Sequence, residues 1–481
     1  MFRIKPVQVP SLSEAVLITV AILFIMGSSI IIYDAPPHIP LAISLLLLVV
    51  YGLIKKVPYK DLEEGVTEGA KAGMAAVFLF FFIGILIASW MLGGTIPTLI
   101  YAGFELVTPS FYFAIVFVIT AIVGMSVGSS LTTVGTVGVA FIGISSAIDA
   151  SLAITAGAIV SGAFFGDKTS PLSDTTNMAS SILKVDLFEH IKNMTWTTVP
   201  AFVITFILFA ILSPKLTDTN FGKMEQFQQG LLDTDLVHWY NGVIPIVVLL
   251  IFSIMKAPAL LALAAGSLSA IAISYINGAT PVGDLFGVLF GGFVSETGVS
   301  EIDELLTRGG IEDMLFTIGL VLLALSMGGL LFTLGIVPRL LASIENMLKK
   351  VRSVILTSAL TAIGINVLVG EQYLSILLTG ESFQSQYKKV GLTNKNLARV
   401  SEDAGTVVNP LVPWSVTGVF ITTVLGVPTL QYFPFAIFCL LCPLLTIFYG
   451  FTGKTLTYID KEKEGAERNI HAENMAKRKM I

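Results

Sequence analysis

Between two short apolar segments the chain reads Gly166-Asp167-Lys168-Thr169-Ser170-Pro171-Leu172-Ser173-Asp174-Thr175-Thr176-Asn177. Pro171 cannot donate a backbone hydrogen bond, so it interrupts a helix at this point. The chain around this segment is 54% hydrophobic and only 13% charged. A soluble domain averages about 25% charged residues, so the composition indicates a polytopic membrane protein. We therefore expect an all-α protein in which residues 166–177 break a membrane-spanning helix.

Apolar runs long enough to span a bilayer, which takes roughly 20 helical residues, occur on both sides of this break. The predicted helical runs are 15–33, 39–54, 72–92, 111–126, 196–213, 239–255, 258–276, 314–335, 353–369 and 430–451. Their order repeats at a shift of about 240 residues, which also brings Asp167 near Asp403. The alternative is that membrane helices resemble one another by composition alone.

Positive charge predicts the orientation, because loops rich in lysine and arginine face the cytoplasm. Both termini are predicted to be cytoplasmic, and the two halves to be inverted-topology repeats, each with a re-entrant hairpin and a broken helix. The predicted divisions are an N-terminal two-helix segment (1–71), repeat 1 (72–213, hairpin near 126–146, broken helix near 166–177), a connecting loop with linking helices (214–313), repeat 2 (314–453, hairpin near 370–382, broken helix near 402–413) and a charged cytoplasmic tail (454–481).

The predicted first hairpin is rich in glycine and hydroxyl residues from Ser126 to Thr136. Glycine permits a tight reversal of the chain, and the hydroxyls offer oxygen ligands. The candidate ligands here are Ser129, Ser130, Thr132 and Thr133. The alternative interpretation is a helix-packing face of small residues.

Two carboxylates make the first break a candidate binding site. Asp167 and Asp174 are seven residues apart, so both would face the same side of a regular helix. A charge at the bilayer centre costs about 2.5–3.5 kcal/mol on insertion scales, so it marks a functional candidate. Lys168, the only base nearby, would pair with an acid and keep the site neutral. Supporting ligands are Thr169, Ser170, Ser173, Thr175 and Asn177. The alternative is a cytoplasmic loop that caps a helix.

The second half contains a counterpart, Glu402-Asp403-Ala404-Gly405-Thr406-Val407-Val408-Asn409-Pro410-Leu411-Val412-Pro413. It again combines acids, a glycine, a hydroxyl and helix-breaking prolines. Glu402 and Asp403 are the candidate cation or proton ligands here, with Thr406 and Asn409 in support. The partner hairpin begins at Glu371, a further candidate, whereas Glu381 is better explained as a helix cap.

These oxygen donors suit small hard cations rather than thiophilic metals. We predict a sodium site at Asp167, Asp174 and Asp403, at which sodium and protons compete for the carboxylates. The histidines fall at helix ends, in loops or in the tail, so the sequence predicts all four to be solvent-facing or interfacial: His38, His190, His238 and His471. No cofactor is expected, and no block of basic residues suggests nucleic acid. The expected partners are the bilayer and small ions, with a small organic anion and a homodimer left open.

The runs Phe164 to Asn177 and Glu402 to Trp414 together resemble the NhaC family of sodium/proton antiporters. The resemblance covers about residues 10–455. It implies a bacterial plasma-membrane exchanger whose fold pairs two inverted repeats, each with a hairpin and a broken helix. The family also includes exchangers that take malate in and lactate out with protons and sodium, and the two motifs do not separate these branches. The resemblance assigns no proton carrier.

Other classes remain as alternatives. An organic-anion exchanger of the malate/lactate type would use helix N-termini, hydroxyls and at least one base, for which Lys168 is a candidate. A passive channel would show no coupling between ions. An intramembrane aspartyl protease needs paired aspartates, but the Phe164–Asp167 context lacks the glycine spacing of that motif, so we do not expect an enzyme.

Overall fold

The computed structural model describes residues 6–106, 109–214, 221–278, 280–297, 303, 306–344 and 349–459. Within these ranges the regular elements are helices, apart from isolated β-bridges that pair Phe293 with Arg308 and Leu392 with Tyr458. The prediction of an all-α protein is therefore confirmed. Most of the predicted charged tail and part of the connecting region 214–313 lie outside the described residues.

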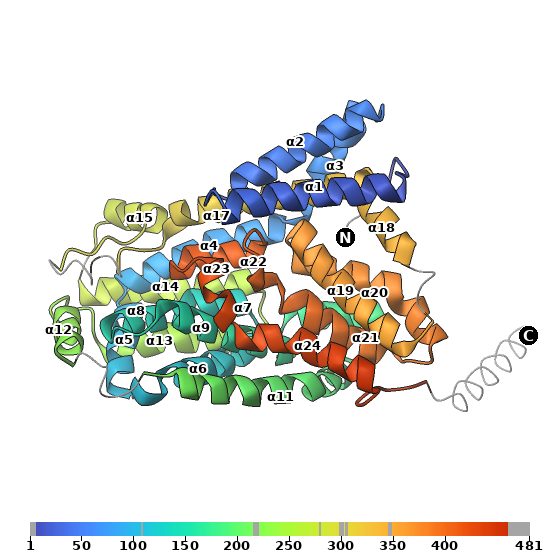
Figure 1. The fold of residues 1–481 in the computed structure, drawn as a ribbon. Coiled ribbons are helices and arrows are strands. Elements are labelled where there is room, and N and C mark those ends of the chain that lie inside the picture. Colours follow the sequence, from blue (N-terminus) through green and yellow to red (C-terminus); the bar gives the residue numbers. More distant parts are fainter. Residues whose placement is uncertain are drawn as a thin grey trace, which may run out of the picture.

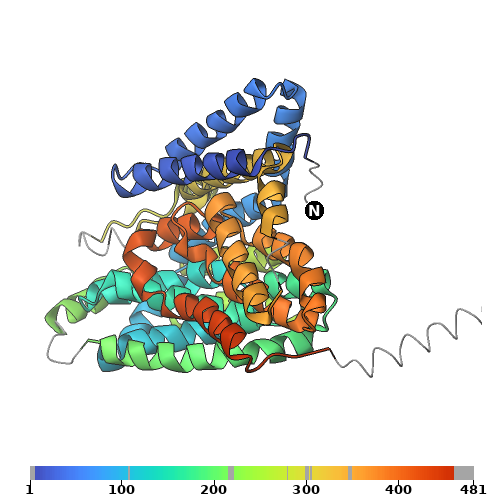
Figure 2. The same ribbon diagram turned by 45° about the vertical axis from the view of Figure 1, so that its right-hand side comes forward.

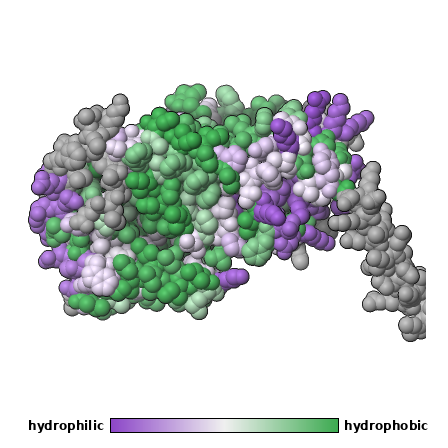
Figure 3. Space-filling view, turned by 90° about the horizontal axis from the view of Figure 1, so that it is seen from below, coloured by the Kyte–Doolittle hydropathy of each residue, from purple (hydrophilic) through white to green (hydrophobic). Residues whose placement is uncertain are grey.

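The surface and the helix lengths fit a membrane setting. Among the described residues, seven helices are long and apolar enough to cross a membrane, or up to nine if each bent pair counts as one span. On α11 (Leu187–Leu212) the exposed side chains include Trp196, Val203 and Ile211. Seen from below, a broad apolar band covers the middle of the molecule and hydrophilic residues gather toward its two ends (Figure 3). Such a band is expected where side chains face lipid.

The helices α1 (Leu12–Ile31), α2 (His38–Ile54) and α3 (Tyr59–Ala72) form an outer layer. This layer lies along one side of the molecule, next to α17 (Gly310–Thr333) (Figures 1 and 2). The predicted two-helix segment thus holds a third helix. The sequence 59–72 is polar, which hid this helix from a search for apolar runs.

Glycine explains why the polar α3 packs so closely. A Cβ atom on Gly69 would lie 2.2 Å from the carbonyl oxygen of Leu325 in α17. A Cβ atom on Gly329 of α17 would lie 2.1 Å from the carbonyl oxygen of Gly65. The two backbones therefore touch, as in other small-residue contacts between membrane helices.

A first series of elements carries the predicted first hairpin and first break. Its members are α4 (Met74–Leu92), α5 (Thr95–Leu106), α6 (Tyr112–Val127), α7 (Ser130–Thr133), the π-helical η2 (Val134–Gly138), α8 (Val139–Ala147), α9 (Leu152–Thr169), α10 (Asp174–Leu183) and α11. Gly128, with φ +72°, ends α6, and the side chain of Ser129 caps α7. Helix α9 ends at Thr169, and after a four-residue break Ser173 caps α10. The helices α12 (Phe221–Leu232), α13 (Trp239–Ile254), α14 (Ala259–Asn277) and α15 (Val282–Gly291) follow.

The second series has the same order. It comprises α17, α18 (Ile336–Ile344), α19 (Val351–Val369), α20 (Gln372–Lys389), α21 (Asn394–Ser401), the π-helical η5 (Glu402–Thr406), η6 (Asn409–Leu411), α22 (Val416–Leu425), α23 (Thr429–Tyr432), η7 (Phe433–Phe435) and α24 (Ile437–Thr452). Gly370, with φ +76°, ends α19, and the carboxylate of Glu371 caps α20. After η6 the chain breaks, and Ser415 caps α22.

The two series agree in length at one register. A shift of 242 residues (130 to 372) takes Ser130–Ala147 to Gln372–Lys389, Leu152–Thr169 to Asn394–Leu411, and Asp174–Leu183 to Val416–Leu425. It also takes Gly128 to Gly370 and Ser173 to Ser415. In this register the counterpart of Asp167 is Asn409, whereas the sequence had paired Asp167 with Asp403.

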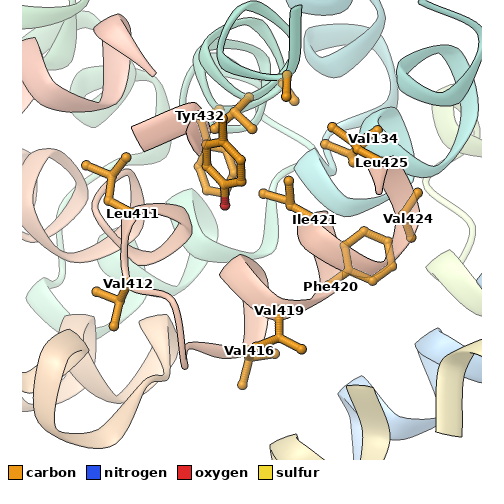
Figure 4. Packing of buried hydrophobic residues seen from close by; sticks show 14 of the residues in the cluster. Val134, Leu411, Val412, Val416, Val419, Phe420, Ile421, Val424, Leu425 and Tyr432 are labelled. Carbon is orange, nitrogen blue, oxygen red and sulfur yellow. The ribbon is translucent and has the colours of Figure 1, made fainter. Parts of the chain in front are cut away.

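Apolar packing ties the two series together around α22. Buried Val416, Val419, Phe420, Ile421, Val424 and Leu425 gather with Val134 of η2, and Leu411 and Tyr432 continue the cluster (Figure 4). The ring of Phe420 stacks on Phe80 of α4, with centroids 5.2 Å apart. Between lipid-embedded helices such contacts stabilise mainly through close packing, because lipid is itself apolar. This packing holds α22, which follows the second break, against η2.

Candidate functional site

Asp167 is a buried carboxylate near the end of α9, and hydroxyl donors surround it. Its Oδ2 atom accepts hydrogen bonds from the Ser130 hydroxyl at 2.6 Å and from the Ser130 backbone N–H at 3.3 Å. Its Oδ1 atom accepts from the Ser173 hydroxyl at 2.6 Å, and the Thr175 hydroxyl lies 3.0 Å from that of Ser173. We call Asp167, Ser130, Ser173 and Thr175 the Asp167 cluster. It gathers the end of α9 and the beginnings of α7 and α10 around one charge.

A cavity of about 380 Å³ opens beside this cluster. Asp167 and Asp174 both line it, and Asp174 is exposed at the first residue of α10. Helices α7, α10, α14 and α20 all begin at or next to lining residues, so the cavity lies at several helix N-termini, where the helix dipole favours negative charge. Lys256, Gln372 and Tyr373 also line it. The cavity therefore combines carboxylates, hydroxyls, an amide and a lysine.

Asp403 lies in a second cluster. Its carboxylate forms an ion pair with Lys168, and the side chains of both residues are fully buried. The Thr446 hydroxyl donates to Asp403 Oδ2 at 2.7 Å, and the Thr197 hydroxyl donates to Oδ1 at 3.1 Å. We call Asp403, Lys168, Thr197 and Thr446 the Asp403 cluster. Asp403 does not line the cavity next to Asp167, so the three aspartates of the predicted sodium site are divided between two places.

The two predicted glutamate ligands have different surroundings. Glu402 is fully buried in η5, and its carboxylate interacts electrostatically with Asp167, Lys168 and Asp403. It is therefore within electrostatic range of both clusters. Glu371 caps α20, because its Oε2 atom accepts a hydrogen bond from the backbone N–H of Leu374 at 2.8 Å.

Several predicted supporting residues hold the backbone of the breaks. The Asn177 amide donates to the carbonyl oxygens of Pro171 at 3.0 Å and Ser173 at 2.7 Å. The Asn409 amide donates to Asn366 Oδ1 at 2.9 Å, and its Oδ1 atom accepts from the backbone N–H of Thr417 at 3.3 Å. Side chains with hydrogen bonds inside their own helix or turn are those of Ser129, Thr132, Thr133, Thr169 and Ser170. Thr406 is buried in η5.

The prediction for His190 was wrong: its side chain is fully buried in α11. The buried His190 interacts electrostatically with Lys168. The sequence also missed Thr197 and Thr446. Thr197 is one of three threonines in Thr195-Trp196-Thr197-Thr198, Thr446 is a single hydroxyl within an apolar run, and for both the partner Asp403 lies more than 40 residues away. Nothing local in the sequence distinguishes them from packing residues.

The chemistry of the Asp167 cluster suits a hard cation. A carboxylate and neutral hydroxyl oxygens are the ligands that such ions prefer. Serine hydroxyls that donate to Asp167 keep their own lone pairs for a cation. Among the described residues, no group of three or more His, Cys, Asp and Glu side chains is arranged to hold a metal ion.

Comparison with known proteins identifies the family to which the sequence is similar. The sequence profile of the Na+/H+ antiporter family matches residues 162–454. The Na+/H+ antiporter NhaC of Alkalihalophilus pseudofirmus is 41% identical over 430 residues, which cover 89% of this chain and 93% of that protein. NhaC of Bacillus subtilis is 36% identical over 92% of this chain and 98% of that protein.

A third relative carries a different name. The malate-2H+/Na+-lactate antiporter of Bacillus subtilis is 33% identical over 466 residues, which cover 96% of this chain and 99% of that protein. The profile match covers the whole Asp403 cluster and every member of the Asp167 cluster except Ser130. By these similarities, the chain belongs to the Na+/H+ antiporter family.

Proposed function

We propose that this protein exchanges sodium for protons across the bacterial cell membrane. The observation that carries the proposal is the position of Asp167 and Lys168, which are neighbours in α9 and belong to different polar clusters. Asp167 faces hydroxyl donors and a cavity, whereas Lys168 neutralises Asp403. A movement at the end of α9 would therefore act on both carboxylates at once.

The proposed exchange follows from the free energy that an unpaired carboxylate charge costs when it is buried. A carboxylate that is removed from water must be neutralised by a proton, a metal cation or a basic side chain. Sodium at Asp167 and a proton on the same group would exclude each other, so binding of one releases the other. Asp403, Glu402 and Glu371 remain candidates for the proton, with Lys168 as the resident counter-charge. The proposal needs no cofactor and no enzymatic step.

The proposed architecture is a pair of inverted repeats, with boundaries at 72–213 and 314–453. The matched lengths of the two helical series support it, as do the matched glycine turns at Gly128 and Gly370. In this proposal the turns before α7 and α20 are the tips of re-entrant hairpins, and both chain termini are cytoplasmic. The two broken helices would then enclose the transport path, as inverted-repeat transporters do.

The test is Asp167→Asn in everted membrane vesicles, read with a pH-sensitive dye after sodium is added. The variant should lose sodium-dependent proton movement, because the neutral amide cannot exchange a proton for sodium. Asp284→Asn is the matched control, since Asp284 is exposed in the first turn of α15 and should behave as the unmodified protein does. Normal exchange by Asp167→Asn would overturn the proposal.

One observation favours the organic-anion alternative. The cavity of about 380 Å³ exceeds the space that a sodium ion requires, and Lys256 lines it together with several helix N-termini. These features would also suit a small carboxylate. Labelled malate and lactate, supplied to vesicles with and without a sodium gradient, would distinguish the two functions. Uptake that Lys256→Gln abolishes would favour the anion.

A further inference from the structure

Gln372 is the first residue of α20, and the surrounding backbone holds it in a defined place. The chain reverses at Gly370, whose carbonyl oxygen accepts a hydrogen bond from the Val416 backbone N–H at 2.9 Å. Glu371 then caps the helix through Leu374. Neither contact involves the Gln372 side chain. The start of α20 is therefore fixed by the residues next to Gln372.

The Gln372 side chain is buried, with 8% of its surface exposed, and it lines the same cavity as Asp167. Its Oε1 atom accepts no hydrogen bond from any described residue. A buried amide oxygen normally has a partner, and an orphaned one calls for an explanation such as a bound ion or water. Other polar side chains line the cavity, and none of those described donates a hydrogen bond to Gln372 Oε1. Among them, the carboxylates of Asp167 and Asp174 cannot donate to an oxygen when ionised.

Comparison of the two series shows why Gln372 lacks the partner that its counterpart has. In the matched register Gln372 corresponds to Ser130, and both follow a glycine turn and a capping residue. Ser130 donates to Asp167, but the counterpart of Asp167 is Asn409. The Asn409 side chain is already bonded to Asn366 and to the backbone of Thr417. The amide of Gln372 therefore has no equivalent partner in its own series.

We propose that Gln372 Oε1 is a direct ligand of the transported sodium ion and completes the site begun by the Asp167 cluster. The inference rests on the proposed exchange of sodium for protons. Asp167 and the hydroxyls come from the first series, and Gln372 supplies a neutral oxygen from the second. Asp403, which is held by Lys168, is then not needed as a sodium ligand. A neutral amide ligand raises the affinity for the cation without adding a group that takes up protons.

The experiment compares Gln372→Leu, Gln372→Glu and the unmodified protein in everted vesicles. Gln372→Leu removes the oxygen and should raise the KM for sodium about tenfold, with the rate at saturating sodium changed less than about twofold. Gln372→Glu keeps an oxygen and adds charge, so its KM at alkaline pH should equal or fall below that of the unmodified protein. Gln431→Leu, at an exposed glutamine of α23, is the matched control.

A second readout does not depend on transport. Sodium should raise the Tm of the purified full-length protein, and Gln372→Leu should shift the midpoint sodium concentration upward by the same factor as KM. If the unmodified protein exchanges sodium for protons but Gln372→Leu leaves both the KM and the midpoint unchanged, the role of Gln372 is overturned and the proposed function stands. An unmodified protein without sodium-dependent proton movement would overturn the proposed function. If Gln372→Leu does not fold, Gln372→Glu provides the test. A KM for sodium at alkaline pH that is higher in Gln372→Glu than in the unmodified protein would overturn the inference.

Discussion

Lys168 of α9 and Asp403 of η5, 235 residues apart in the chain, form an ion pair in which both side chains are fully buried. The pair joins the two helical series at their breaks. Lys168 also lies 3.3 Å from the Thr197 hydroxyl and 5.8 Å from the centre of the Phe438 ring. Because each charge would be costly alone in such surroundings, the two residues depend on each other.

The first prediction concerns this pair. Lys168→Met or Asp403→Asn alone leaves an unpaired buried charge and should lower the free energy of unfolding by about 3–5 kcal/mol. The double variant removes both charges and should recover most of that loss. Thermal unfolding of the purified protein in detergent measures all three. Sodium-dependent proton movement should be lost in both single variants and in the double variant. If the double variant lost as much stability as the two single variants added together, that result would contradict the coupling.

Much of the fold could be predicted, because apolar length is a local property of the sequence. The predicted runs 39–54, 239–255 and 353–369 correspond to α2, α13 and α19 with ends that differ by no more than two residues. The register in which the two helical series match could not be predicted. Apolar runs have indistinct ends, so the pairing of Asp167 with Asn409 emerged only from the bounds of the helices and the positions of their caps.

Less of the site could be predicted. The sequence indicated that Lys168 pairs with an acid, and the structure identifies that acid as Asp403. It could not place Asp167 and Asp403 in separate clusters, because that depends on tertiary structure, which brings Thr197 of α11 and Thr446 of α24 to Asp403. The sequence did not identify Gln372 as a candidate ligand, since an amide at the start of a helix has no distinctive local pattern. Its exposure to the cavity is a property of the tertiary structure.

The second prediction tests the contact between α3 and α17. Gly69→Ala places a methyl group 2.2 Å from the Leu325 carbonyl oxygen, so the helices must separate. The free energy of unfolding should fall by about 1–3 kcal/mol. Gly364→Ala is the control, because nothing lies within 4 Å of a Cβ atom at that position in α19. It should be neutral or slightly stabilising, and equal losses in the two variants would argue against a packing role for Gly69.

The third prediction separates two serines that both donate to Asp167. Ser130→Ala and Ser173→Ala should each raise the KM for sodium, because each removes a hydroxyl from the Asp167 cluster. Ser173 also caps α10 by accepting from the Thr176 backbone N–H at 3.4 Å. Ser173→Ala should therefore lower the free energy of unfolding by about 0.5–2 kcal/mol more than Ser130→Ala does. Equal thermal stability of the two variants would show that the cap contributes nothing.

The fourth prediction concerns competition between sodium and protons. If both ions neutralise Asp167, acidification should raise the KM for sodium by up to about tenfold per pH unit and leave the rate at saturating sodium unchanged. Everted vesicles assayed over a series of pH values and sodium concentrations measure both quantities. Asp284→Asn should show the same slope as the unmodified protein, because its side chain is exposed on α15. A KM for sodium that stays flat as pH falls would mean that the two ions bind separate groups, and the proton would then have to be sought at Glu402 or Asp403.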